Sequence, residues 1–118
     1  MPYMLLIVEP TEQRRSRTEA EGRAVYDRML RFADDLRSKG VLLGAESLAS
    51  HSGAVRVQVR DGKPRVTDGP FAEAKEMIGG FFLLDCKSRE DAISLAALCP
   101  AAEWCTVEVR SLAPCYEQ

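Results

Sequence analysis

The sequence has no surplus of positive charge. Its 16 Lys and Arg residues are balanced by 18 Asp and Glu residues, which gives a net charge of -2 at pH 7. A protein that holds nucleic acid by its phosphates needs a cationic surface, so we expect no direct contact with nucleic acid. The content of hydrophobic residues, 46%, and of charged residues, 29%, is typical of a folded globular protein.

Long hydrophobic runs are also missing. The apolar run near the N-terminus covers residues 3–8, which is too short for the core of a signal peptide or for a membrane span, and no basic segment precedes it. The sequence therefore predicts a cytoplasmic protein without a membrane segment. A chain of 118 residues is long enough for one compact domain with its own core.

Histidine is scarce, because His51 is the only one in the chain. A single histidine forms neither a metal site nor a catalytic triad, and we interpret His51 as a loop residue, with a role as ligand as the alternative. The four cysteines, Cys86, Cys99, Cys105 and Cys115, have spacings that match no zinc or redox pattern. We interpret them as reduced structural thiols, with Cys115 the most exposed, and expect neither a metal nor a cofactor.

Several segments have the patterns of strands. Residues 3–8 and 78–84 are apolar at nearly every position, which is typical of strands buried on both faces. A second strand is predicted around residues 46–49 and a last one over about residues 105–112. Val55, Val57 and Val59 alternate with polar residues, and the turn Asp61–Gly62 predicts a hairpin that returns over residues 63–67.

Two segments have helical patterns. Thr18 and Glu21 have the spacing of a capping box, and Gly40 follows a cationic last turn, so the first helix is predicted over about residues 19–39. Its apolar residues recur at intervals of three and four and predict one core face. Ser88 is the predicted N-cap of the second helix, which Pro100 ends.

The order of these elements predicts an α+β fold. If the hairpin is an insertion, the remaining order is βαββαβ, the ferredoxin-like unit with strand order 4-1-3-2. Its two central strands are then the two with apolar residues on both faces. Two helices cover only one face of such a sheet, so we expect a homodimer that packs sheet on sheet around an internal cleft.

The stretch from Asp68 to Glu76 is the predicted site, because it combines a glycine, a proline, an aromatic residue and four charges directly before a buried strand. Gly69 and Pro70 have a structural interpretation, since glycine permits a positive φ and proline fixes the next φ, which together form a rigid turn. Asp68 either bonds the amides of this turn or acts as a general acid or base or a ligand-orienting carboxylate.

An extended backbone after the turn would direct Phe71, Glu73 and Lys75 to one side. We then expect Lys75 to bind an anion or donate a proton as the partner of Asp68, Phe71 to form an apolar wall, and Glu73 to contact the ligand. The alternative for Glu73 and Lys75 is a surface ion pair that contributes little.

Further candidates for the cleft are Glu46 and Arg110, with surface exposure as the alternative for both, and Tyr3, with burial in the core as the alternative. Gly79 and Gly80 lack the pattern of a phosphate loop, and a bulge or a close approach of backbones explains them better. The arginines at positions 14, 15 and 17 are interpreted as a solvated rim.

Residues 66–76, Val-Thr-Asp-Gly-Pro-Phe-Ala-Glu-Ala-Lys-Glu, followed by Gly-Gly-Phe-Phe at 79–82, resemble the signature of the YCII-related family in its DGPF-motif branch. The resemblance extends to residues 3–7, 40–42, 44–48 and 107–110, and to Val57 with residues 60–62. It implies a single domain over residues 1–118 that forms a dimeric α+β barrel of ferredoxin-like halves.

What the resemblance implies about function is less definite. An enzymatic role is inferred for the wider family from a His-Asp pair, and some members occur fused or adjacent to extracytoplasmic-function sigma factors. Asp68 matches the motif aspartate, whereas the histidine has no match, because His51 lies outside the motif. We expect a protein that binds a small organic molecule at the dimer interface, with or without cofactor-independent acid/base turnover. The alternatives are a regulatory module acting with a sigma factor and a ligand sensor.

Overall fold

The computed structural model describes residues 2–116, which form an α+β fold of two α-helices and antiparallel sheets. In chain order the elements are β1 (Pro2–Pro10), the 3-10 helix η1 (Arg14–Ser16), α1 (Glu19–Ser38), β2 (Leu42–Ser47), η2 (His51–Gly53), β3 (Val55–Arg60), β4 (Lys63–Asp68), β5 (Glu76–Asp85), α2 (Arg89–Leu98), η3 (Pro100–Glu103) and β6 (Thr106–Ser111).

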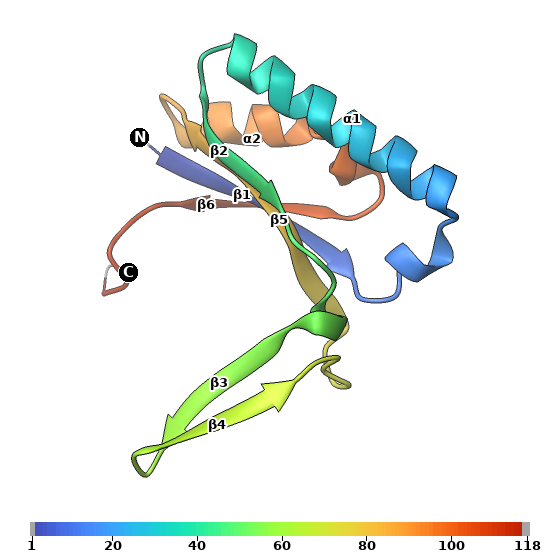
Figure 1. Cartoon of the computed structure of the whole chain (residues 1–118). Coiled ribbons are helices and arrows are strands. Elements are labelled where there is room, and N and C mark those ends of the chain that lie inside the picture. The colour runs from blue at the N-terminus through green and yellow to red at the C-terminus, as the bar shows by residue number, and fades with distance from the viewer. Residues whose placement is uncertain (1, 117–118) are drawn as a thin grey trace.

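A four-stranded sheet has the order β2-β5-β1-β6, and all its neighbours pair antiparallel. Counted without β3 and β4, this is the predicted order 4-1-3-2, and the arrangement is compatible with a ferredoxin-like fold. Figure 1 shows α1 and α2 together on one face of this sheet. Strands β3 and β4 form a separate two-stranded sheet.

The core lies between the helices and the sheet. Leu5 of β1, Leu84 of β5 and Leu36 of α1 are fully buried there. The rings of Phe32 and Phe82 meet edge to face, with centroids 5.1 Å apart, which is a favourable geometry for aromatic pairs. The predicted core face of α1 is thereby confirmed. No helix among residues 2–116 is long and apolar enough to cross a membrane.

The predicted ends of the helices are confirmed. The amide of Glu21 donates to Thr18 Oγ1 at 3.1 Å, and the Thr18 amide donates to Glu21 Oε1 at 2.8 Å, which completes the capping box. These hydrogen bonds hold the pKa of Glu21 below its usual value. Gly40 has a φ of 73° just after α1, and α2 stops two residues before Pro100.

The prediction for the second strand was wrong in its bounds. We placed it around residues 46–49, but β2 runs over Leu42–Ser47. Its position is set by packing, because Leu42 and Ala45 lie against the core and pair with Leu84 and Phe82 of β5. The hairpin is confirmed, with a positive φ of 53° and 74° at the two turn residues.

The cysteines are free thiols, as predicted. Cys86 and Cys99 are buried, Cys105 is half-buried and Cys115 is exposed. Burial raises the pKa of Cys99 to about 11, which keeps this thiol protonated and unreactive at neutral pH.

The second face of the sheet, opposite the helices, is covered by no element of the described chain. Met4 and Leu6 of β1 pair in register with Leu83 and Phe81 of β5, and all four side chains are only partly buried. Ile78, next to them, is 41% exposed. We call this surface the open face. Its apolar side chains agree with the prediction that β1 and β5 have the pattern of strands buried on both faces.

Candidate functional site

A cavity of about 1020 Å³ lies between α1 and the sheet, and we call it the α1 cavity. Its apolar wall includes Ile7, Met29, Phe82 and Trp104. Its volume is at the upper end of the range typical of ligand sites. The space exists because α1 lies over β1 and β5 with partly buried residues such as Met29 facing the sheet.

Charged side chains surround this apolar wall. Arg17 and Arg28 lie over the ring of Trp104, with their guanidinium carbons 5.8 and 5.3 Å from its centroid. Arg28 is also bound to Glu103 at 2.7 Å. Arg17 lines the cavity, and no carboxylate of residues 2–116 forms an ion pair with it. Arg17 is therefore a cation that can bind an anionic group of a ligand.

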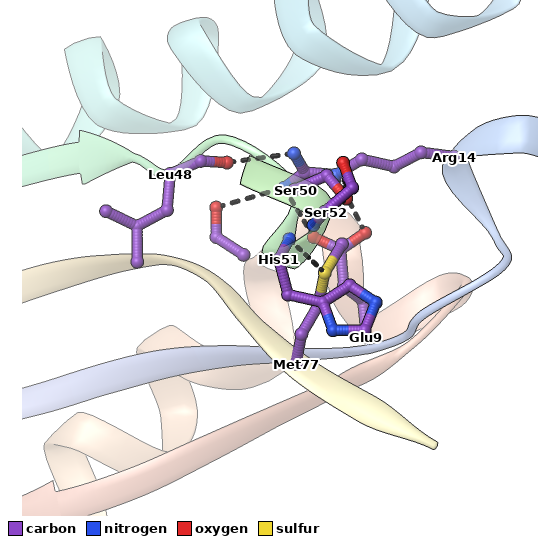
Figure 2. A network of polar contacts seen from close by, with 8 residues as sticks. Glu9, Arg14, Leu48, Ser50, His51, Ser52 and Met77 are labelled. Atoms are coloured by element: carbon purple, nitrogen blue, oxygen red, sulfur yellow. Dashed lines mark hydrogen bonds and ion pairs between the residues drawn. The ribbon is translucent and has the colours of Figure 1, made fainter. Parts of the chain in front are cut away.

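An ion pair between a buried carboxylate and a partly exposed arginine lines the α1 cavity. Glu9, which is 6% exposed, receives Arg14 Nη2 on Oε1 at 2.7 Å and Arg14 Nε on Oε2 at 3.1 Å. Arg14 also donates to the carbonyls of Leu48 and Gly79, at 2.8 and 3.3 Å (Figure 2). This guanidinium thus ties β1, β5 and the end of β2 together, and the prediction that Arg14 belongs to a solvated rim was wrong.

The ion pair explains one of the two consecutive glycines in β5. A Cβ on Gly79 would meet the Glu9 carboxylate and lie 3.0 Å from Arg14 Nη2. The register between β1 and β5 also shifts at this point, so that Ile7 pairs with Gly80 and Val8 with Ile78. The sequence predicted a bulge or a close approach of backbones here. The bulge is present at Gly79, and at Gly80 a Cβ would lie 2.8 Å from the Glu46 carbonyl, so the backbones also approach closely.

The second hollow is a shallow groove of about 470 Å³ beside the Gly69–Pro70 turn, which we call the turn groove. It is lined by Pro10, Thr11, Glu12, Arg15, His51, Pro70, Phe71, Ala72, Ala74 and Lys75. It shares no lining residue with the α1 cavity. Of the predicted site residues, the structure brings Phe71 and Lys75 together here.

His51 lies directly against the turn. The Phe71 amide donates to His51 Nδ1 at 3.4 Å, and the two rings are 5.8 Å apart. Since Nδ1 is the acceptor, the neutral ring has its proton on Nε2. The His51 amide in turn donates to Met77 Sδ at 3.4 Å, which fixes η2 to the start of β5 (Figure 2).

The predicted extended backbone at Phe71–Lys75 was wrong. The Ala74 amide donates to the Phe71 carbonyl at 3.0 Å, which makes this segment a turn. Phe71 is consequently buried, and Arg56 of β3 covers its ring at 3.7 Å. Glu73 is an exposed partner of Arg56 at 3.3 Å rather than a neighbour of Lys75 on one strand face.

The other predicted site residues lie apart. Asp68 ends β4 and is exposed, and no amide of residues 2–116 donates to its carboxylate, so the alternative turn bond does not form. Glu46 lines the α1 cavity. Arg110 contacts Glu108 at 3.3 Å on the edge strand β6. Tyr3 is 8% exposed in the core, as its alternative stated.

Comparison with known proteins places this arrangement in a family. A family model described as the YCII-related domain matches residues 1–115. The chain belongs to the YCII-related family. An uncharacterized protein, R00369 of Rhizobium meliloti (strain 1021), is 34% identical over 83 residues, which cover 67% of this chain and 67% of the relative. Membership of the DGPF-motif branch stays a prediction from residues 66–76.

For this YCII-related protein, sequence reasoning missed three features of the site. Glu9 and Arg14 are five residues apart, with no helical or strand spacing that would have indicated a bidentate pair. In the sequence the β3–β4 hairpin separates His51 from the Gly69–Pro70 turn, but the end of the hairpin brings the chain back to His51. Gly69 was explained by a positive φ, which it does not have; a Cβ there would instead meet the His51 carbonyl.

No three His, Cys, Asp or Glu side chains of residues 2–116 gather in a way that could hold a metal ion. The arrangement offers instead a cavity with an apolar wall and the Arg17 guanidinium, and a groove lined by an imidazole, an ammonium group and an aromatic ring. The first suits binding of an amphipathic anion, and the second suits proton transfer.

Proposed function

We propose that this YCII-related protein binds a small organic molecule with an apolar body and an anionic group in the α1 cavity. The observation behind this is Arg17, which forms no ion pair among residues 2–116 and lies beside the apolar wall of Met29, Phe82 and Trp104. The apolar body would displace water from this wall, and the anion would gain a charge-assisted hydrogen bond from Arg17. Glu46, at the rim, would disfavour a second negative charge.

Trp104 is the only tryptophan and therefore reports directly on the cavity by its fluorescence. Aromatic and aliphatic carboxylates, each measured beside its uncharged amide, serve as probes. We expect Arg17→Ala to raise the Kd of a bound carboxylate about tenfold, the lower end of what a hydrogen bond to a charged group contributes, and to leave the Kd of the amide unchanged.

The matched control is Arg31→Ala, which removes an exposed arginine of α1 that does not line the cavity. Its carboxylate affinity should equal that of the wild type. If Arg17→Ala binds carboxylates as tightly as the wild type, or weakens carboxylates and amides equally, Arg17 is not the anion site.

The ligand site is proposed to work in a homodimer, the dimeric α+β barrel with the β3–β4 hairpin as an insertion. The open face supports this, because Met4, Leu6, Phe81 and Leu83 would otherwise stay in contact with water. Two such faces packed together would bury the apolar surface that the helices leave uncovered.

A second candidate function is acid/base catalysis at the turn groove, without a cofactor. It is favoured by Lys75 and the imidazole of His51 lining one groove beside Phe71. In this proposal Lys75 binds an anion or donates the proton, and Phe71 is the apolar wall. Asp68 ends β4 outside the groove lining, so it would act as the general acid or base on a substrate that extends out of the groove.

With a substrate found by screening, we expect Asp68→Ala and Lys75→Ala each to lower kcat about a hundredfold, the lower end of what a positioned acid or base contributes. Lys63→Ala at the hairpin end, an exposed lysine outside the groove, is the control and should keep full turnover. Undiminished turnover in both Asp68→Ala and Lys75→Ala would remove this candidate.

A further inference from the structure

The hairpin of β3 and β4, residues 55–68, which we call the ribbon, projects from the body of the molecule and away from both helices (Figure 1). Every residue of its two strands is exposed. The radius of gyration is 16.1 Å, whereas a compact chain of this length has roughly 13.5 Å. The ribbon therefore extends away from the body of the chain instead of packing against it.

The two faces of the ribbon differ in chemistry. Paired residues of an antiparallel ladder share a face, and the pairs here are Val57 with Val66 and Val59 with Pro64. They form one face with Val55 and its partner Asp68, and this face is apolar apart from Asp68 at the base of the ribbon. Its four valines are 53 to 63% exposed. The other face consists of Arg56, Gln58, Arg60, Lys63, Arg65 and Thr67.

An isolated two-stranded hairpin is marginally stable in water, and a contiguous apolar face on it is a sign of a contact surface. The base of this ribbon is nevertheless built firmly. The Gly69 amide donates to the Ala54 carbonyl at 2.7 Å, and Arg56 lies 3.7 Å over the buried ring of Phe71. The ribbon thus has a defined direction, with its valine face free to receive a partner.

We infer that the valine face of the ribbon packs against a second copy of this chain, as an arm of the homodimer. The inference rests on the proposed homodimer and adds the location of one contact between the two copies. The ribbon points to the side of the sheet that the helices leave open (Figure 1), which is the side on which the second copy of the proposed homodimer would pack.

Charge also favours a second copy. The ribbon contains four cations and two carboxylates, a net charge of +2; since the whole chain has -2, the rest of each copy has -4. A cationic arm and an anionic body attract each other over a distance, although the cations lie on the face opposite the valines. In a two-fold dimer each copy would give one arm and receive one, so both valine faces would be buried at once.

The test is the dissociation constant of the dimer, measured by sedimentation equilibrium. Val57→Glu places a charge in the centre of the valine face and should raise this constant at least a hundredfold. Gln58→Glu, the next residue on the same strand, places the same charge on the opposite face and should change it less than threefold. Circular dichroism of both variants establishes that they are folded.

A second measurement uses the wild type, so a folding defect of a variant cannot affect its result. Hydrogen exchange of the amides at 55–68 should slow when the protein concentration rises through the dissociation constant. A monomeric wild type would overturn the homodimer and the arm together. A dimeric wild type whose constant is unchanged by Val57→Glu, or whose ribbon stays unprotected in the dimer and becomes protected only on adding another protein, such as a sigma factor, would overturn the arm alone.

Discussion

Arg14→Ala is expected to lower the free energy of unfolding by about 3 kcal/mol, the lower end of what removing one partner of a buried ion pair costs. The substitution leaves the Glu9 carboxylate, whose side chain is 8% exposed, without its cation and without two charge-assisted hydrogen bonds. It also removes the donors to the carbonyls of Leu48 and Gly79. Chemical denaturation followed by circular dichroism measures the change.

Arg15→Ala is the matched control, because this neighbouring arginine is 69% exposed and lies 3.5 Å from an equally exposed Glu12. Its effect should stay below about 0.5 kcal/mol. Replacing both members of the buried pair, by Glu9→Leu with Arg14→Met, should cost less than Arg14→Ala alone, since no charge is then left unpaired. Equal stability of Arg14→Ala and Arg15→Ala would show that the ion pair does not stabilise the fold.

Gly69→Ala is expected to destabilise the protein by about 3 kcal/mol, the upper end of the usual cost of overpacking. The added methyl would meet the His51 carbonyl and lie 3.2 Å from the Ala54 carbonyl, and both are backbone atoms that cannot change rotamer. The turn would have to move away from η2, which would weaken the contact between the rings of His51 and Phe71. Thermal unfolding measures the loss.

Gly53→Ala is the control for this substitution, because a Cβ at Gly53 meets nothing within 4 Å, although it ends the same 3-10 helix η2. Its melting temperature should stay within a few degrees of the wild type, which corresponds to less than about 0.5 kcal/mol. If Gly69→Ala melts like Gly53→Ala, the conformation of the Gly69–Pro70 turn is not limited by space.

The candidate site was only partly accessible from the sequence. Phe71 and Lys75 were predicted to lie together and do line one groove, but as parts of a turn rather than of a strand. The direction of a side chain in such a segment depends on each φ and ψ, and a period-two pattern cannot supply these angles. Glu73 therefore faces Arg56, which the sequence places seventeen residues earlier.

The α1 cavity illustrates the same limit. Its walls come from η1, α1, three strands, η3 and the segments that carry Arg17 and Trp104. The only predicted site residue among them is Glu46. Arg17 has no special spacing in the sequence, and its availability follows from where the other arginines find their carboxylates. That Arg17 forms no ion pair among residues 2–116 is a property of the whole charge arrangement, so only the packed chain reveals it.

By itself, the sequence determined the elements and their order: the capping box at Thr18, the turn at Asp61–Gly62, the stop before Pro100 and the two central strands. The caps and turns depend on residues a few positions apart, and the central strands follow from runs of apolar residues that predict burial. The tertiary structure alone decided that Arg14 holds Glu9 and that His51 lies on Phe71. Such contacts depend on how distant segments meet, and pairing of β5 with β1 and β2 brings these segments together.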